Sequence, residues 1–476
     1  MSESESSLAP PAVSMELHAG NRERLVAALT AHLSASGRPL RGIVLLQGGE
    51  EQTLYCTDRV PIFRQESYFA YLLGVREPGF YGAVYRFAPR LTPDCAIFMG
   101  EKTLSFFKDT YKVDSVFYVD ELAQVVRSQF SEHGEPLLFL LYGKNTDSGN
   151  YSKPASFEGI KKFDTDLSTL HPILTECRVI KSDMELALIQ YANDVSSEAH
   201  IEVMRKIKPG MKESQLESTF LYHANYYGDC RHCSYTCICA TGENRRSLFL
   251  PVGHAGASND RVQIFMMLVG CSLAYVLVLL LLIRTSEYNF YGSDITCSYP
   301  VNGKFKRNQA IVYNAVLKAH NDVISHIHPG VKWIDMHKLA EQRILESLKK
   351  ENIIHGCWVL FSCLMVGHLL GIDTHDPGGY PEGLEKPKEL GLRSSRTIRE
   401  LKKGMVITVE PGCYFIDALL RHARDDPISS KFFNWENIEM YKSFGGVRIE
   451  SNLGKWRKKA RVTVETTKKK SERARK

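Results

Sequence analysis

The sequence lacks a secretory signal and the disulfide framework that often accompanies one. Residues 1–15 contain serine, glutamate and proline, with neither a basic start nor an apolar core, so they do not match a signal peptide. The twelve cysteines are therefore expected as free thiols in a reducing compartment, which we take to be the cytoplasm. A length of 476 residues, with 44% apolar and 24% charged residues, fits a soluble protein of two or three domains.

Excess positive charge is also missing from most of the chain. The formal net charge is +6, yet residues 454–476 hold eleven Lys or Arg against two Glu, a net of +9 that leaves the rest of the chain at −3. A mildly acidic body gives no reason to expect nucleic acid as a partner. The basic segment 454–476 is predicted to be a solvated, disordered tail.

The cysteines around His232 do not favour a thiolate zinc site. Cys230, Cys233, Cys237 and Cys239 lie close to it in sequence, but SYTCIC at 234–239 alternates like a strand. This pattern places the last two cysteines on one face as small apolar side chains. A structural zinc site is the alternative interpretation.

The first half of the chain predicts a mixed α/β domain. Residues 41–47 form a short buried-strand run closed by two glycines, and similar apolar runs follow at 68–75, 94–99 and 137–142. Ser182 and Glu185 then form a capping box that begins an amphipathic helix, which Pro209 and Gly210 end. We therefore expect five segments: a disordered N-terminus (1–18), an N-terminal domain (19–160), a linker (161–181), a second domain (182–453) and the basic tail (454–476).

An internal repeat organises the second half. A shift of 120 residues places Ala319-His320 on Ala199-His200 and Pro329-Gly330 on Pro209-Gly210, with three further matches in the same register. Each copy predicts a helix, a Pro-Gly stop and a second helix, from about residue 213 and about residue 334. The fold class is therefore α+β: the α/β N-terminal domain followed by a duplicated domain with a pseudo-twofold axis and a site between its halves.

Four candidate metal ligands occur in separate segments of the C-terminal half: Asp294 in an alternating strand, His368 in GHLLG, Glu410 after an apolar strand, and Glu450 at the end of GGVRIE. A buried carboxylate is costly unless it is paired or binds a cation. Several carboxylates with one histidine suit divalent ions such as Mn²⁺, and two such ions can activate water and polarise a carbonyl. Taken singly, each residue could instead cap a turn or pair with an arginine.

Several motifs closely resemble eukaryotic prolidase, an Xaa-Pro dipeptidase of the pita-bread metallopeptidase family. The resemblance covers residues 21–450 with gaps, and its strings are SYTCIC (234–239), GHAGA (253–257), SDITCS (293–298), GHLLGIDTHD (367–376), GGYPEG (378–383), TVEPG (408–412) and FGGVRIE (444–450). The segments LLQGGEE (45–51) and FRQES (63–67) match in the N-terminal domain. The resemblance implies a pita-bread catalytic domain and a dinuclear Mn²⁺ dipeptidase that cleaves dipeptides ending in proline or hydroxyproline.

The resemblance also implies roles for individual residues. It makes Asp294, His368, Glu410 and Glu450 metal ligands, and gives Glu410 the proton-shuttling role as well. The residues expected to bind substrate or stabilise the reacting carbonyl are His254, His375 and Arg396, with Arg448 close by. An Xaa-Pro bond has no N–H, so a cationic group for the free carboxylate has to help recognise the dipeptide. We expect a homodimer.

The sequence departs from the resemblance near the site. The first metal-binding Asp of the family, in Asp-Met-Gly-Gly, is replaced by Ile283, and a catalytic histidine before His368 is replaced by Leu364. Residues 245–252 replace a shorter stretch with Leu-His-Tyr, and after Glu450 the pattern is lost, which predicts a shortened strand there. A dinuclear site without that Asp should hold at most one ion tightly, so we expect impaired activity.

Residues 264–283 carry no charge, which by length makes them a membrane-span candidate. A span here would separate His254 from Asp294, so we favour an anomalous apolar insert, such as a mispredicted exon, over a membrane-tethered variant. Two further functions are compatible with the sequence. The chain could be a catalytically dead pita-bread protein that binds partners, or an aminopeptidase that acts ahead of proline.

Overall fold

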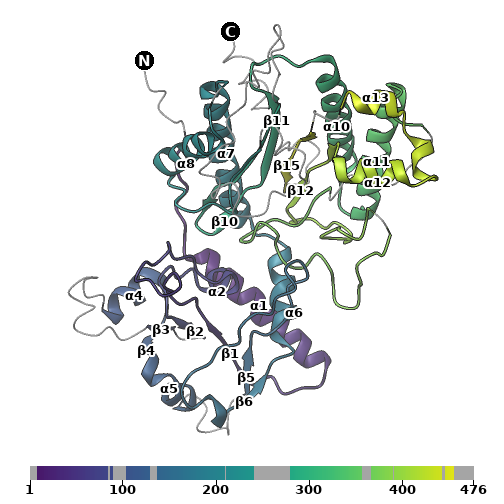
Figure 1. Cartoon of the computed structure of the whole chain (residues 1–476). Helices are drawn as coiled ribbons and strands as arrows, with labels where there is room; N and C mark the ends of the chain where they lie inside the picture. The colour runs from purple at the N-terminus through teal and green to yellow at the C-terminus, as the bar shows by residue number, and fades with distance from the viewer. Residues whose placement is uncertain are drawn as a thin grey trace. The chain divides into compact units, whose positions relative to one another are not determined.

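The computed structural model describes residues 8–83, 86–88, 103–128, 137–209, 211–240, 279–355, 366–389, 391–441 and 445–454. Contacts divide the chain into two compact units (Figure 1). One is Ala12–Val179, and the second is made of Ile180–Lys476 with Met1–Pro11.

The N-terminal unit is built on a mixed six-stranded sheet of order β4-β3-β2-β1-β5-β6. The central strand β1 pairs parallel with β5 and antiparallel with β2. The hydrophobic core of the unit includes Leu45, Leu138 and Leu140. The strands are β1 Ile43–Gln47, β2 Tyr81–Gly82, β3 Arg86–Ala88, β4 Val116–Tyr118, β5 Leu137–Leu140 and β6 Asp164–Asp166. The helices are α1 Glu16–Ala35, α2 Ser67–Leu73, α4 Leu104–Tyr111, α5 Leu122–Ser128 and α6 Leu170–Val179, with 3₁₀ turns η1 Val119–Glu121 and η2 Ile160–Lys162.

The apolar run at 68–75 lies mostly in helix α2, unlike the strand run at 41–47 to which it is similar in sequence. All seven residues of α2 except its first are buried, and a helix buried on every side shows no apolar periodicity in its sequence. Its ends carry helix signals, because the Glu66 side chain accepts from Phe69 N and Gly74 adopts a left-handed conformation. The runs at 41–47 and 137–142 are confirmed as strands, and residues 94–99 lie outside the described residues.

Two expected segment limits differ from the structure. Helix α1 begins at Glu16, so residues 16–18 belong to a helix and not to the predicted disordered N-terminus. Residues 161–181, expected as a linker, contain β6 and α6, which belong to the N-terminal unit. The contact boundary therefore falls after Val179, directly before the capping box of the next helix.

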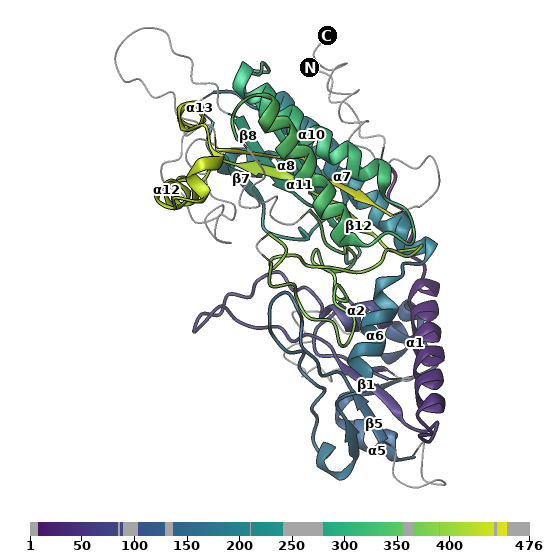
Figure 2. The same ribbon diagram turned by 90° about the vertical axis from the view of Figure 1, so that its right-hand side faces the viewer.

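The second unit contains the predicted helix pairs: α7 Asp183–Lys206 with α8 Glu213–Gly228, and α10 Arg307–His326 with α11 Trp333–Lys350. Figure 2 shows α10 and α11 lying side by side, and the helices of each pair are in contact. The repeat register is confirmed at the helix ends, where Ile207 N donates to Val203 O and Ile327 N donates to Val323 O. Ser182 forms the expected capping box with Glu185.

The strands of this unit lie against those helices. Strand β8 is the centre of the sheet β11-β8-β7, β12 pairs with β15, and β13 pairs with β14. Helix α7 contacts β9, β10 and β11, whereas α10 contacts β12, β13 and β14. The strands are β7 Ile238–Ala240, β8 Leu279–Arg284, β9 Glu287–Tyr288, β10 Tyr291–Gly292, β11 Ile295–Pro300, β12 Ile407–Val409, β13 Gly412–Tyr414, β14 Gly446–Arg448 and β15 Ser451–Leu453. The remaining helices are α12 Asp417–Asp425, η4 Ser429–Phe432 and α13 Trp435–Glu439.

The apolar run 264–283 is described only at its C-terminal end. Residues 264–278 lie outside the described residues, and residues 279–283 belong to β8. None of the helices that the structure describes is long and apolar enough to cross a membrane.

Candidate metal centre

Three strand ends and the segment that carries His368 meet in the second unit. Asp294 directly precedes β11, Glu450 lies between β14 and β15, and Glu410 lies between β12 and β13. His368 is joined to the same region because its carbonyl accepts from Thr408 N, while Glu410 N donates to Val366 O. The structure thus brings together all four side chains that sequence analysis proposed as metal ligands.

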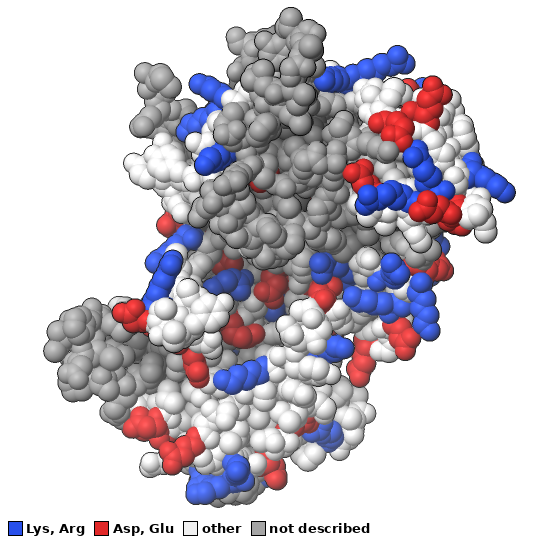
Figure 3. Space-filling view, viewed as in Figure 1, with Lys and Arg blue, Asp and Glu red and all other residues white. Residues whose placement is uncertain are grey.

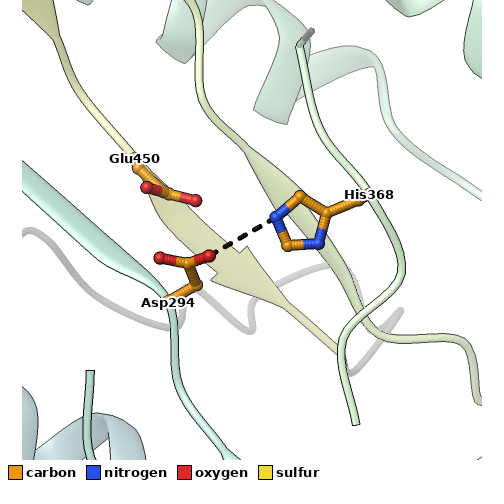
Figure 4. Close-up of side chains that lie close together, drawn as sticks. All are labelled: Asp294, His368 and Glu450. Carbon is orange, nitrogen blue, oxygen red and sulfur yellow. Dashed lines mark ion pairs between the residues drawn. The ribbon is translucent and has the colours of Figure 1, made fainter. Parts of the chain in front are cut away.

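Asp294, His368 and Glu450 offer ligand atoms that all lie within 4.8 Å of one another. Figure 4 shows these side chains converging, with an ion pair between His368 Nε2 and Asp294 Oδ2 at 3.4 Å. Glu410 joins the group through its Oε1, which lies 3.4 Å from the same Nε2. All four side chains are buried.

The imidazole of His368 is held with Nε2 toward the carboxylates. Its Nδ1 lies 2.9 Å from the carbonyl oxygen of Leu369, and because a carbonyl only accepts, Nδ1 carries the hydrogen. This leaves Nε2 as the atom that can bind a cation. Burial lowers the pKa of His368, but the hydrogen bond to Asp294 and the charge of Glu410 outweigh it and raise the pKa.

Unsatisfied carboxylate oxygens fit a cation at this point. Among the described residues, Asp294 Oδ1 and Glu450 Oε1 are buried and have no hydrogen-bond partner. Burial, followed by the neighbouring charges of Asp294 and Glu410, raises the pKa of Glu450 well above its usual value, and burial likewise raises the pKa of Glu410. A divalent ion would compensate this concentration of buried negative charge, and carboxylates with one imidazole are suitable ligands for it.

Two threonines, which sequence analysis missed, orient the carboxylates. The hydroxyl of Thr296 donates to Glu450 Oε2, and that of Thr408 lies 3.4 Å from Glu410 Oε1. Both lie two residues from a ligand along the chain, Thr296 after Asp294 and Thr408 before Glu410. Side chains two residues apart on a strand lie on the same face, so this spacing is the sequence signal that could have identified both threonines.

A buried cluster of serines fixes the segment that leads to Asp294. The hydroxyl of Ser196 on α7 lies 2.7 Å from those of both Ser286 and Ser293, and it also accepts from Ser286 N at 2.9 Å. All three serines are fully buried. Because Ser293 directly precedes Asp294, this cluster attaches the ligand-bearing strand to α7.

Arg448 supplies the positive charge that lies against Glu410. Its Nη1 lies 3.0 Å from Glu410 Oε2, and its backbone is held by Ser298, whose hydroxyl donates to Arg448 O and accepts from Arg448 N. Among the described residues, its Nε and Nη2 have no hydrogen-bond partner. The charges of Tyr414, Glu410 and Glu450 outweigh burial and raise the pKa of this guanidinium.

His375 lies beside the four candidate ligands, with its ring centroid 4.6 Å from that of His368 at an interplanar angle of 86°. Burial, with further contributions from His368, Arg396 and Arg448, lowers the pKa of His375 to about 2, so the ring is neutral. Tyr235, which sequence analysis did not single out as a site residue, lies 6.5 Å from His375 between ring centroids.

Several residues of the sequence-based site are not covered by the structure. His254, Leu364 and residues 245–252 lie outside the described residues. Ile283 is described through its backbone: it pairs with Thr296 on β11 and with Ile238 on β7. Directly opposite residues of an antiparallel pair share a face, so position 283 is on the face of the sheet from which Thr296 reaches Glu450.

A short strand follows Glu450. Residues 451–453 form β15, which pairs antiparallel with β12 in the register Thr408↔Asn452. The amide of Asn452 donates to Asn193 on α7 at 2.7 Å, and Ser451 lies 3.0 Å from His320 on α10. Both repeats therefore hold the strand that presents Glu450.

Comparisons with known proteins agree with this geometry. Residues 187–453 match the profile of metallopeptidase family M24, and residues 18–139 match the aminopeptidase P N-terminal domain. The chain is 46% identical to the Xaa-Pro dipeptidase of Homo sapiens over 93% of this chain and 89% of that protein, and 44% identical to that of Mus musculus with the same coverage.

Solved structures show the same fold. The chain resembles Pseudomonas aeruginosa aminopeptidase PepP with a TM-score of 0.72 and 23% identity, covering 97% of this chain and 98% of that one. Aminopeptidase P is a pita-bread protein, so the expected fold class is confirmed. With a family match over more than half of its length and relatives at this level of identity, the chain belongs to metallopeptidase family M24.

Proposed function

We propose that the chain is a metallodipeptidase for Xaa-Pro and Xaa-hydroxyproline dipeptides, with Mn²⁺ as its metal. The observation that carries the proposal is the convergence of Asp294, His368, Glu410 and Glu450 beside the cation Arg448. The relatives named Xaa-Pro dipeptidase support the substrate class. Three carboxylates with one imidazole are suitable ligands for Mn²⁺, whereas thiolate ligands are not.

Each side chain has a role in the proposed reaction. A divalent ion in this site would act as a Lewis acid on the scissile carbonyl and increase the acidity of water. Glu410 Oε1 takes the proton of the attacking water and gives it to the leaving prolyl nitrogen, while Arg448 holds Oε2 and so fixes the carboxylate. Neutral His375 hydrogen-bonds to the reacting carbonyl, and His254 is assigned to the same part of the substrate.

Recognition of proline follows from what the substrate lacks. The Xaa-Pro bond has no N–H, so the site has to hold the dipeptide by its free carboxylate. Arg396 and the free Nε and Nη2 of Arg448 are the proposed cations for that carboxylate. A dipeptide should therefore be preferred to a longer peptide, whose carboxylate would lie elsewhere.

The site of this chain is proposed to be impaired. Ile283 stands where the resemblance expects a chelating Asp, and four protein ligands do not fill two coordination spheres. Leu364 stands where a histidine is expected, and loss of such a group commonly costs orders of magnitude in rate. We therefore expect slow turnover with at most one tightly bound ion.

The test is a comparison of Gly-Pro with Gly-Pro-Ala as substrates of the Mn²⁺-supplemented protein, followed by NMR. Slow cleavage of the dipeptide alone, abolished in Glu410→Gln, supports the proposal. Preferred cleavage of the tripeptide would instead support an aminopeptidase, the function that the probable Xaa-Pro aminopeptidases at 30–31% identity favour. Cleavage of neither peptide would leave the dead pita-bread binding protein as the better interpretation.

We further propose a cytoplasmic homodimer without nucleic-acid or membrane partners. Over the described surface in Figure 3, Lys and Arg are intermixed with Asp and Glu, as a mildly acidic body predicts. Light scattering of the purified protein measures the assembly directly, and a monomer at micromolar concentration would refute the dimer.

A further inference from the structure

A buried ion pair lies beside the candidate metal centre without belonging to it. Lys181 Nζ and Asp376 Oδ2 are 2.7 Å apart, and each side chain is 1% exposed. Removing both charges from water is costly, and such a pair seldom stabilises a fold more than well-packed apolar side chains would. Stability alone therefore gives little reason for this buried ion pair, and its location offers another reason.

Asp376 closes the loop that carries His375. Its N–H donates to Leu369 O at 3.0 Å, while Gly371 N donates to Asp373 O at 3.1 Å. The other carboxylate oxygen of Asp376, Oδ1, accepts from Asp373 N at 3.3 Å. A Cβ at Gly371 would lie 2.6 Å from the carboxylate, so the loop is closed around Asp376 without space for another side chain.

Lys181 is itself fixed from the opposite side. The backbone N–H of Lys181 donates to the carbonyl of Gly404, in the turn before β12, at 2.8 Å. Ser182, the residue after Lys181, caps α7. Gly404 has φ +91°, and a Cβ there would lie 2.8 Å from Ile180. The ammonium group is thus presented from the junction of α7 with the segment that leads to Glu410.

His375 lies between two anchored neighbours. Thr374 donates from its hydroxyl to Ser234 O at 2.9 Å, and Asp376 is held by Lys181. The rings of His375 and His368 lie edge to face, 4.6 Å between centroids, and the two anchors flank His375 in the chain. A shift of the loop of even about 1 Å would move His375 away from His368.

We propose that Lys181 and Asp376 are positioning residues that act as one unit to hold His375 against His368. Their ion pair does not include any of the four ligand side chains, so their effect passes through the loop 369–376. The catalytic use of His375 rests on the proposed function. The positioning of His375 by the ion pair does not, because it concerns the metal-free protein.

The test uses Lys181→Met, Asp376→Asn and the double variant of the full-length protein, without metal. The measured quantity is the rate at which diethyl pyrocarbonate modifies His375, relative to the exposed His328 of the same molecule, by peptide mass spectrometry. We expect each single variant to raise this ratio at least about fivefold, and the double variant to raise it no further, because residues of one unit give non-additive effects.

Two controls separate positioning from a general loss of stability. Arg343→Met removes the Arg343–Asp322 pair of the same unit (2.6 Å) and should leave the ratio unchanged. Lys181→Arg retains a cation and should stay within about twofold of the parent protein. An unchanged ratio in Lys181→Met, or equal increases in Arg343→Met, would overturn the proposal. Because the assay requires neither metal nor substrate, its outcome does not depend on whether the chain is a dipeptidase.

Discussion

At the scale of single residues, the site depends on hydrogen bonds behind the ligands. Thr296 holds Glu450, so Thr296→Val removes a donor without changing the side-chain shape. We expect Mn²⁺ affinity to fall by roughly tenfold, as is usual when such supporting contacts are lost. Isothermal titration calorimetry measures it, with Thr219→Val on the exposed side of α8 as the matched control. Equal affinity in both variants would show that the hydrogen bond from Thr296 to Glu450 does not support metal binding.

His320 predicts a pH dependence of stability. Burial, partly offset by Asn321, lowers the pKa of His320 to about 4 from 6.5. The unfolded chain therefore takes up the proton first as the pH falls, and stability present above about pH 6.5 is lost toward pH 4.

The expected loss in the free energy of unfolding is about 2 kcal/mol between pH 7 and pH 5. The variant His320→Gln should lack this part of the pH dependence. Urea unfolding followed by tryptophan fluorescence measures it for the second unit alone, because all four tryptophans of the chain (Trp333, Trp358, Trp435 and Trp456) belong to it. The same pH dependence in the variant would refute the assignment to His320.

At the scale of elements, we propose that β8 decides how many ions the candidate metal centre can hold. Its register places position 283 opposite Thr296, on the site face of the sheet. We expect Ile283→Asp to increase tightly bound Mn²⁺ toward two ions per chain, because it adds a carboxylate where the resemblance expects one. Ile283→Asn, of the same shape but uncharged, is the control. If neither variant binds more metal by mass spectrometry of the dialysed protein, β8 does not supply the missing ligand position.

Sequence patterns predicted those elements whose signals are local. The capping box at Ser182 and the 120-residue repeat located α7, α8, α10 and α11 because caps and stops are short-range features. Helix α2 was missed because a completely buried helix has no polar face. The four candidate ligands were proposed from their residue types and positions and then from the resemblance, but Thr296 and the Lys181–Asp376 pair were not. Those contacts join segments far apart in sequence and have no local pattern.

At the scale of the whole molecule, the charged tail and the folded body are predicted to be separable. Strand β15 ends at Leu453, and a Cβ on Gly454 would lie 3.2 Å from Val406, so the described fold continues to residue 454. Deleting 455–476 should change the melting temperature by no more than about 1 °C, since no described contact is lost. It should also reverse the net charge from +6 to −3, which ion-exchange chromatography detects.

A longer deletion, of 451–476, provides the contrast because it also removes β15. Its pairing with β12 and the contacts of Ser451 and Asn452 would be lost, so we expect unfolding or a melting temperature lower by many degrees. Similar stability of the two truncated proteins would contradict the role given to β15 in holding Glu450.

One buried cation position shared by Asp294, His368, Glu410 and Glu450 is central to the proposed function. Counting Mn²⁺ per chain after equilibrium dialysis, in the parent protein and in Asp294→Asn, tests it most directly. We predict one tightly bound ion in the parent and none in the variant. Two tightly bound ions in the parent, or a variant that binds as well as the parent, would contradict the ligand assignment.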